Sequence, residues 1–240
     1  MKKIYFDNGS TSFPKAPGVS DAIKRTLDGG AFNINRGDYE DAYEVAGAVF
    51  ETRETLCRLF RFQGGSKYAV FTPSVTYSLN YILKGFLKPG DHVVVSSMEH
   101  NAVMRPLAQL AAQGVSFDVA QCDARGVLDP AQVAALLRAN TRMVIMTAAS
   151  NVCGTHLPVR EIGELCRARG IFFVLDSAQV AGVFPLDMES CHISALAFTG
   201  HKGLLGPQGV GGMLISPAHR GRNGQRVRSG GHARLFTRPI

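Results

Sequence analysis

The fold is decided by one stretch of the sequence, Met143 to Asp176, which reads "MVIMTAASNVCGTHLPVREIGELCRARGIFFVLD". Its apolar runs at 143–148 and 171–176 predict two buried strands, and the amphipathic stretch from Val159 to Arg169 predicts a helix between them. Gly170 follows the arginine-rich last turn of that helix, where a left-handed cap is expected. Two buried strands joined by a helix are typical of a parallel sheet, so the stretch predicts an α/β fold.

The same alternation of apolar runs and amphipathic stretches continues on both sides. We expect strands at Tyr68–Thr72, His92–Ser96, Ser116–Ala120, Met143–Ala148, Ile171–Asp176, Ala195–Thr199 and Gly211–Ser216. We expect helices at Ala16–Leu27, Tyr39–Phe60, Val75–Phe86, Ala102–Gln113, Pro130–Ala139 and Val159–Arg169. The sequence therefore predicts a mostly parallel, seven-stranded sheet with helices on both faces.

Composition narrows the class of protein further. The chain has 240 residues, 45% of them hydrophobic, which is enough for one large α/β domain or two small ones. There is no run of 18 apolar residues, and the N-terminus turns polar before a signal peptide could form, so we expect a cytoplasmic protein without a membrane span. The five cysteines are scattered and include no CxxC pair, which argues against a disulfide framework and against a structural zinc site, and we expect no metal.

The basic charge is concentrated at one end of the chain. Six arginines and no acidic residue lie in Pro217–Ile240, and these arginines account for all but one unit of the net charge of +7. The strand and helix alternation also stops after Ser216. We therefore expect one domain at 1–216, which includes an N-terminal arm. We expect a disordered or poorly packed arginine-rich tail at 217–240. The tail lacks interleaved aromatic residues, so nucleic-acid binding is not favoured.

Polar residues follow the predicted strands at the points where the strands end. Because the carboxyl ends of parallel strands meet at one edge of a sheet, we expect these side chains to gather there. Thr76 falls in the first turn of a helix, where free backbone N–H groups suit a phosphate. The other strands deliver Glu99 and His100, Asn151, Asp176 and Gln179, and finally Thr199, His201 and Lys202.

An amine, a carboxylate, an imidazole and a phosphate seat together indicate pyridoxal 5'-phosphate. The aldehyde of this cofactor forms a Schiff base with a lysine, its ring nitrogen requires a carboxylate, and its phosphate requires hydroxyl groups and a helix N-terminus. A lysine at its usual pKa of about 10.4 is almost wholly protonated at neutral pH. Partial burial of Lys202 would favour the reactive free amine.

The chain resembles the cysteine desulfurase family, within the class V aminotransferase fold group of pyridoxal phosphate enzymes. The resemblance covers about residues 4–216 and rests on seven motifs in the family's order, which are "YFDNGSTSFP", "NINRGDY", "TPSVTYSLN", "SSMEHNAVMRP", "SNVCGT", "VLDSAQ" and "TGHKGLLGPQG". The implied fold is the large domain of a pyridoxal phosphate-dependent transferase. The implied reaction removes sulfur from L-cysteine and leaves alanine.

The resemblance also implies a role for each matching residue. Lys202 would form the Schiff base, Asp176 would pair with the pyridinium nitrogen and Gln179 would bind the phenolic oxygen. His100 would stack on the ring and shuttle protons, and Asn151 would lie beside cofactor and substrate. The phosphate would be held by Thr76, Thr199 and His201, with the backbone at Val75 beside it. The catalytic set is thus Lys202, His100 and Asp176.

This chain departs from the family pattern after Ser216. The resemblance implies a smaller C-terminal domain that carries the persulfide-forming cysteine and a substrate-binding arginine, and we expect both to be missing here. Cys153, two residues after Asn151, is the best-placed substitute nucleophile among the five cysteines, although a small structural thiol is the commoner role at such a position. The implied partners are an amino-acid substrate, a sulfur-acceptor protein and a second copy of the chain in a homodimer.

Other functions remain open on the sequence alone. A class V aminotransferase, a cysteine or selenocysteine lyase, and a catalytically inactive cofactor-binding fragment would share the same motifs. A nucleotide-binding enzyme is not favoured, because no GxxxxGK[ST] motif is present and the glycines of "GPQGVGG" precede a strand.

Overall fold

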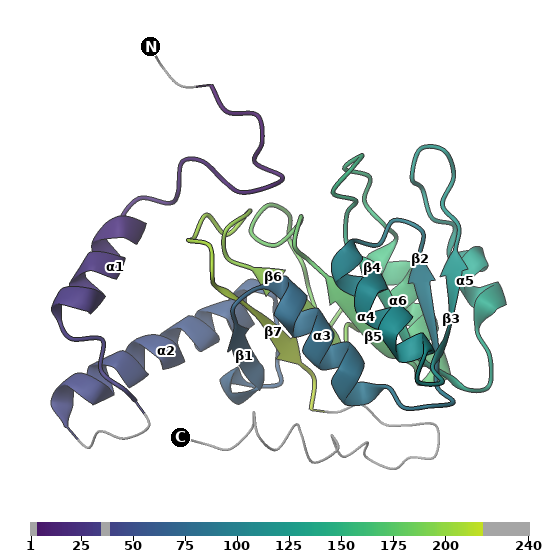
Figure 1. Ribbon diagram of the computed structural model, residues 1–240, viewed down its shortest axis with the longest axis horizontal. Helices are drawn as coiled ribbons and strands as arrows, with labels where there is room; N and C mark the ends of the chain where they lie inside the picture. The colour runs from purple at the N-terminus through teal and green to yellow at the C-terminus, as the bar shows by residue number, and fades with distance from the viewer. Residues whose placement is uncertain (1–3, 35–38, 218–240) are drawn as a thin grey trace.

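A seven-stranded sheet forms the centre of the protein, seen in a computed structural model that describes residues 4–34 and 39–217 (Figure 1). Its strands are β1 (Ala69–Thr72), β2 (His92–Ser96), β3 (Ser116–Ala120), β4 (Thr141–Thr147), β5 (Phe172–Asp176), β6 (Ala195–Thr199) and β7 (Gly211–Ile215). Their order across the sheet is β1-β7-β6-β5-β4-β2-β3. Only β7 runs against its two neighbours, β1 and β6. The predicted α/β fold with a mostly parallel, seven-stranded sheet is confirmed.

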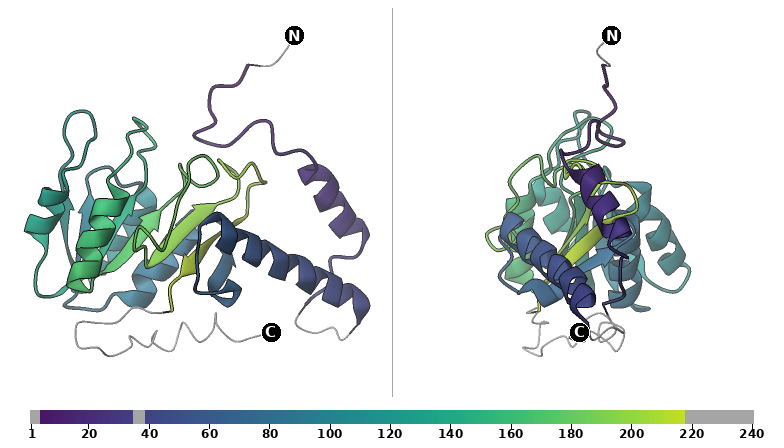
Figure 2. Two further views of the ribbon diagram at one scale, coloured as in Figure 1. Left: turned by 180° about the vertical axis from the view of Figure 1, so that it is seen from behind. Right: turned by 90° about the vertical axis from the view of Figure 1, so that its left-hand side faces the viewer.

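Helices cover both faces of the sheet (Figures 1 and 2). The helices are α1 (Val19–Asp28), α2 (Glu40–Leu59), α3 (Val75–Phe86), α4 (Asn101–Ala111), α5 (Pro130–Leu136) and α6 (Val159–Arg169). One buried apolar cluster joins α3 and α4 to the sheet, and a second joins α5, α6 and the end of α2 to it. Two cores on opposite faces explain why the central strands are apolar along their whole length.

The first two helices extend away from the sheet (Figures 1 and 2). No residue of α1 is buried, and only Ala42, Leu56 and Cys57 are buried in the 20-residue helix α2. Large apolar side chains on this extension are exposed, among them Phe50 and Tyr43. The extension therefore has an apolar surface that residues 4–34 and 39–217 leave exposed.

Sequence-predicted boundaries agree closely with the structure, and three strands and two helices agree at both ends. The larger differences have local causes. Helix α1 begins three residues later than expected because Gly18, at φ 82°, is its N-cap. Helix α5 ends three residues early because Leu137 is extended, and Tyr68 belongs to a 3-10 turn (Ser66–Tyr68) instead of β1.

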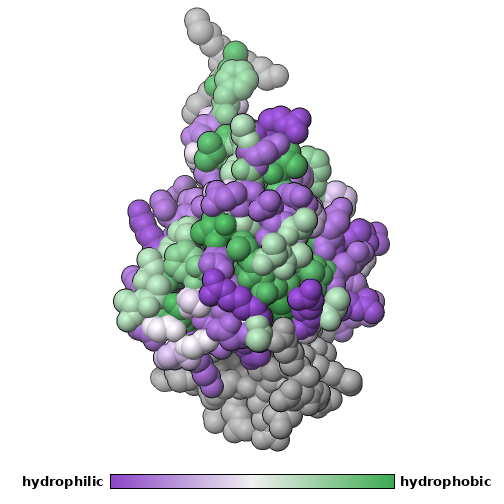
Figure 3. Space-filling view, turned by 90° about the vertical axis from the view of Figure 1, so that its right-hand side faces the viewer, coloured by the Kyte–Doolittle hydropathy of each residue, from purple (hydrophilic) through white to green (hydrophobic). Residues whose placement is uncertain are grey.

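The β3 edge of the sheet carries charged side chains. Asp118 on β3 pairs with Arg138, and its carboxylate lies 3.3 Å from Nε2 of His92 on the neighbouring strand. Burial lowers the pKa of His92, whose Nδ1 lies 2.8 Å from the Thr141 hydroxyl oxygen. Viewed from this end, apolar surface is interspersed with polar residues (Figure 3). Charge on an edge strand discourages pairing with another chain.

A topological switch point lies between β2 and β4. The chain passes from β2 to β3 on one side and then returns to place β4 on the other side. The loops that leave β2 and β4 therefore diverge, and a crevice is expected outside the carboxyl ends of these strands.

Two sequence predictions concern the ends of the chain and the membrane. Apart from Pro217, the arginine-rich segment 217–240 lies outside the described residues. Within the part that is described, no helix is both long and apolar enough to cross a membrane.

Candidate active site

A cavity of about 230 Å³ opens at the carboxyl edge of the sheet. Its lining contains every residue that the sequence analysis assigned to the cofactor, namely Val75, Thr76, His100, Asn151, Asp176, Gln179, Thr199, His201 and Lys202. These residues come from five separate segments of the chain, so the fold brings together side chains that are up to 127 positions apart. Their individual roles stay predictions.

One end of the cavity is suited to an anion. Ser74 caps α3 by accepting a hydrogen bond from the Tyr77 N–H, and Val75 and Thr76 form the first turn behind it. In the same cavity, Thr199 Oγ1 and His201 Nδ1 are buried and have no hydrogen-bond partner among the described residues. Buried polar atoms without partners are costly, and the helix dipole adds positive potential here. An anion with several acceptor oxygens would satisfy both features.

The opposite charges of the cavity are Asp176 and Lys202. Asp176 ends β5, is 3% exposed and accepts a hydrogen bond from the Ala178 N–H at 2.9 Å. Burial raises the pKa of this carboxyl, while the Ala178 N–H and the charges of Lys202 and His100 oppose the increase. Burial lowers the pKa of Lys202, and the charge of Asp176 opposes that change. The site therefore favours the free amine more than water does.

His100 lies at the start of α4, on the wall of the cavity. Its Nδ1 accepts a hydrogen bond from the Ala102 N–H at 3.0 Å, so in the neutral imidazole the proton is on Nε2. Gln179 donates a hydrogen bond to the Gly9 carbonyl at 3.2 Å. Asn151 is exposed in the turn that follows β4.

The N-terminal arm is fastened to the loop that carries Lys202. The carbonyl oxygen of His201 accepts four hydrogen bonds, at 2.8–3.1 Å. The donors are the Thr11 hydroxyl, the Ser12 N–H and hydroxyl, and the Lys15 ammonium. That carbonyl belongs to the peptide unit immediately before Lys202. The arm therefore helps to fix the backbone from which the amine extends.

Close packing explains the glycine that follows Lys202. A Cβ on Gly203 would lie 2.4 Å from the carbonyl oxygen of Ala181, well inside van der Waals contact. The absence of a side chain lets the Lys202 loop lie directly on the segment that follows Gln179. In the local pattern "HKG", the lysine supplies the amine and the glycine permits the close packing of the loop.

Four residues that line the cavity were not assigned from the sequence, namely Ser10, Ser74, Thr147 and Ala178. Ser10 belongs to the quoted motif "YFDNGSTSFP", but nothing in the sequence shows that the arm folds back over the sheet. Thr147 is the last residue of β4, and the strand-end rule could have found it had the strand not been extended to Ala148.

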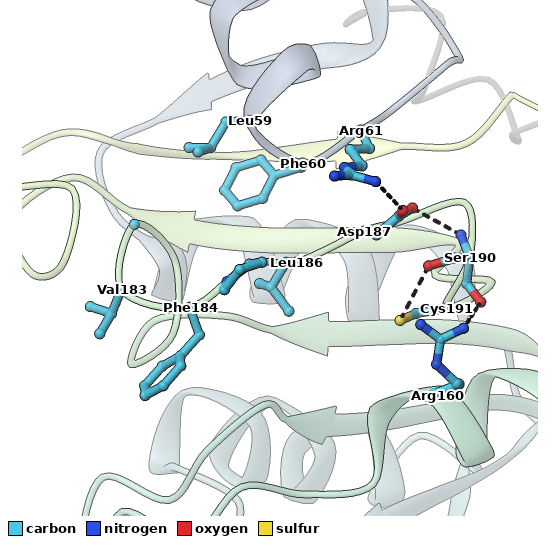
Figure 4. A pocket seen from close by; sticks show the side chains of 12 residues that line it. Leu59, Phe60, Arg61, Arg160, Val183, Phe184, Leu186, Asp187, Ser190 and Cys191 are labelled. Carbon is cyan, nitrogen blue, oxygen red and sulfur yellow. Dashed lines mark hydrogen bonds and ion pairs between the residues drawn. The ribbon is translucent and has the colours of Figure 1, made fainter.

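A second, larger cavity of about 590 Å³ lies between the end of α2 and the segment 182–191 (Figure 4). Its floor is apolar, with Phe60 and Leu186, and its charged groups already have partners. Arg61 lies 3.5 Å from Asp187, and Arg160 donates to the Ser190 carbonyl. The smaller cavity is therefore the better candidate for chemistry.

Cys153 is exposed and is not among the residues that line the candidate site. Hydrogen bonds involving Ser150 and Thr155 lower the pKa of its thiol to about 7. A pKa near neutrality favours the thiolate form, but the structure places the Cys153 thiol outside the cavity. Its role as a substitute nucleophile stays untested.

An open α/β sheet with a lysine-bearing cavity at its carboxyl edge is typical of an enzyme that binds a cofactor. Comparison with known proteins identifies the family. Residues 4–237 match the model of the family described as Aminotransferase class-V. The chain belongs to this family, whose members depend on pyridoxal phosphate. The match continues past Ser216, so it includes most of the segment that the sequence analysis set apart.

Named relatives agree with this assignment. The chain is 32% identical over 239 residues to cysteine desulfurase IscS of Vibrio atlanticus, covering 97% of this chain and 58% of that protein. Among solved structures, the apo cysteine desulfurase of Thermococcus onnurineus superposes with a TM-score of 0.83 at 29% identity, covering 89% of this chain and 53% of the other. The structure titled "SspA in complex with cysteine" superposes with a TM-score of 0.82 at 26% identity, covering 89% and 61%. The chain thus spans little more than half the length of these relatives.

The residues of the cavity fit pyridoxal phosphate. The α3 N-terminus and the unpartnered atoms of Thr199 and His201 suit its phosphate. The buried Asp176 suits a protonated ring nitrogen, and the partly buried amine of Lys202 suits its aldehyde.

Proposed function

We propose that this chain is the cofactor-binding part of a cysteine desulfurase, which takes sulfur from L-cysteine and leaves alanine. The observation that carries the proposal is the single cavity in which Asp176, His100, Lys202 and the N-terminus of α3 meet. Cysteine as the substrate is supported by the names of the relatives and by the solved complex with cysteine.

Each residue contributes a distinct physical function. Bound pyridoxal phosphate supplies an electron sink that weakens the bonds to the α-carbon of an amino acid. Lys202 provides the attaching amine, and Asp176 provides the negative charge that stabilises a protonated ring. His100 holds a proton on Nε2, from which it can exchange one with the substrate. The loop between β6 and β7 and the N-terminal arm keep the Lys202 backbone in place.

The experiment compares cofactor capture by the unmodified chain and by Lys202→Ala. Each protein is incubated with pyridoxal phosphate and then reduced with borohydride, and the covalently trapped cofactor is measured by mass spectrometry. We expect trapping at one site in the unmodified chain and its loss in Lys202→Ala. Lys84→Ala, which removes an exposed lysine on α3, is the matched control and should label normally. Equal labelling of Lys202→Ala and the unmodified chain would contradict the assignment.

Product analysis then separates the desulfurase from its alternatives. A desulfurase forms alanine from cysteine and leaves the sulfur as a protein-bound persulfide, whereas a lyase releases it directly. An aminotransferase instead passes the amino group to a 2-oxo acid. A chain that traps the cofactor at Lys202 but forms none of these products would be a cofactor-binding fragment.

Assembly and location are also part of the proposal. We propose a homodimer, supported by the uncovered apolar side chains of α1 and α2, and a sulfur-acceptor protein as the second partner, which follows from the proposed persulfide chemistry. All five cysteines are free thiols, which supports a cytoplasmic, reducing location.

A further inference from the structure

Glu99 occupies a gap in the sheet at the switch point. Strand β2 pairs with β4 as far as Val95 and Ile145, and then turns toward β3, so that the Ser97 N–H donates to the Ala120 carbonyl at 2.9 Å. The Thr147 N–H, at the end of β4, therefore lies beyond the last backbone partner in β2. Glu99 Oε1 accepts the hydrogen bond from this N–H at 2.9 Å. A side-chain oxygen thus takes the place of the backbone acceptor that β2 no longer provides.

The hydrogen bonds of the Glu99 carboxyl are unequal. Oε1 also accepts from the Ser96 hydroxyl at 2.5 Å, whereas Oε2 is buried and has no partner within the ranges 4–34 and 39–217. Two donors at one oxygen and none at the other fit a neutral acid, with Oε1 as the carbonyl oxygen and the proton on Oε2. Burial raises the pKa of Glu99 to about 8, although these hydrogen bonds oppose the increase, and the charge of Asp176 raises it further.

The surroundings of Glu99 connect it to the cavity on both sides. His100 is the next residue, and Thr147 both lines the cavity and pairs with Asp176 of β5. The groups that face the carboxyl from β2 and β4 are the uncharged Ser96 hydroxyl and Thr147 N–H, and the charged group acting on it from β5 is Asp176. A negative charge on Glu99 would add to that of Asp176. It would then compete with Asp176 for the positive charges that act there, those of Lys202 and His100.

We propose that Glu99 is a positioning residue whose neutral carboxyl joins the end of β2 to β4 and thereby fixes His100 and Thr147 on the wall of the cavity. The inference rests on the proposed function only in treating this cavity as the active site. The contact itself is a property of the folded chain and can be measured without added cofactor.

The test compares Glu99→Gln, which keeps an uncharged acceptor of the same length, with Glu99→Leu, which removes the acceptor. The measured quantity is the hydrogen-exchange rate of the Thr147 amide at neutral pH, with the Val144 amide as the internal reference. We expect Glu99→Gln to exchange within about twofold of the unmodified chain, and Glu99→Leu to exchange at least about tenfold faster. The control is Glu164→Gln, at an exposed position on α6, which should change nothing.

A second measurement addresses the active site. The dissociation constant for pyridoxal phosphate should rise at least about fivefold in Glu99→Leu and return to near its original value in Glu99→Gln, because the neutral acceptor restores the strand connection. If Glu99→Leu does not fold, as judged by circular dichroism, Glu99→Asp replaces it, because its shorter side chain cannot reach Thr147.

Two outcomes would overturn the inference, namely unchanged Thr147 exchange in Glu99→Leu or the same loss of protection in Glu99→Gln. Failure of the proposed function looks different. In that case Lys202 would capture no cofactor in any variant, while the Thr147 amide would still respond to substitution of Glu99.

Discussion

At the scale of single residues, Glu99 gives the stability of the protein a pH dependence with a definite sign. The pKa of the Glu99 carboxyl is about 8 in the folded chain, against an ordinary value of 4.5 for a glutamate in water. Between these values the folded state keeps a proton that the unfolded state has lost, so the free energy of unfolding falls as pH rises. The contribution is fully present below pH 4.5 and is lost by about pH 8.

Comparison with Glu99→Gln isolates this effect, because the amide does not titrate. We expect the unmodified chain to lose stability relative to Glu99→Gln as pH rises from 4.5 to 8, by at most ~1.4 kcal/mol per pH unit. Urea denaturation at several pH values measures the difference, and all other titrating groups are common to both proteins. Parallel stability curves would mean that Glu99 keeps an ordinary pKa in the folded chain.

At the scale of elements, the packing of α6 depends on one glycine. A Cβ on Gly163 would lie 1.8 Å from the carbonyl oxygen of Cys191, in the turn before β6. The two atoms nearest to this Cβ are backbone atoms of Cys191, so the clash cannot be relieved by moving a side chain. Gly163→Ala must therefore displace α6 or the turn. We expect a loss of about 1–3 kcal/mol in the free energy of unfolding, measured by urea denaturation.

The matched control for this substitution is Gly85→Ala in α3. A Cβ at Gly85 has no heavy atom within 4 Å, and alanine is the better helix former. Gly85→Ala should therefore leave stability unchanged or increase it by up to about 1 kcal/mol. Equal effects of the two substitutions would show that helix propensity, and not the contact with Cys191, decides the outcome.

At the scale of the whole molecule, the extension formed by α1 and α2 is the expected site of self-association. Leu27 and Phe50 are 67% and 58% exposed there, and apolar side chains that lie together on an exposed surface mark a site of protein–protein contact. We expect sedimentation velocity to show a dimer at micromolar concentration. Phe50→Lys should weaken dimerisation at least about tenfold, because it places a charge in the apolar surface.

The control for self-association adds the same charge elsewhere. Gln109→Lys changes an exposed polar residue on α4, far from the extension in the sequence, and should leave the dimer intact. A monomeric unmodified chain, or equal weakening by both substitutions, would contradict the assignment of the interface to this extension.

The sequence predicted the fold well for identifiable reasons. Strands such as Phe172–Asp176 are buried on both faces and are apolar throughout, and helix α6 has both an amphipathic period and a glycine cap. The errors occurred where backbone geometry at a single residue decides, as at Gly18 and Leu137. The roles of individual site residues were inferred from family motifs, and the structure establishes only that these residues share one cavity.

The sequence by itself determined the order of strands and helices and the residue types at the strand ends, because hydrophobic period and turn chemistry are local properties of the chain. Only the tertiary structure decided which of these residues meet. The convergence of Thr11, Ser12 and Lys15 on the His201 carbonyl joins segments about 190 positions apart, and the bond from Thr147 to Glu99 exists because β2 and β4 diverge at the switch point. Contacts of this kind depend on how the chain crosses itself, which no local pattern of residues encodes.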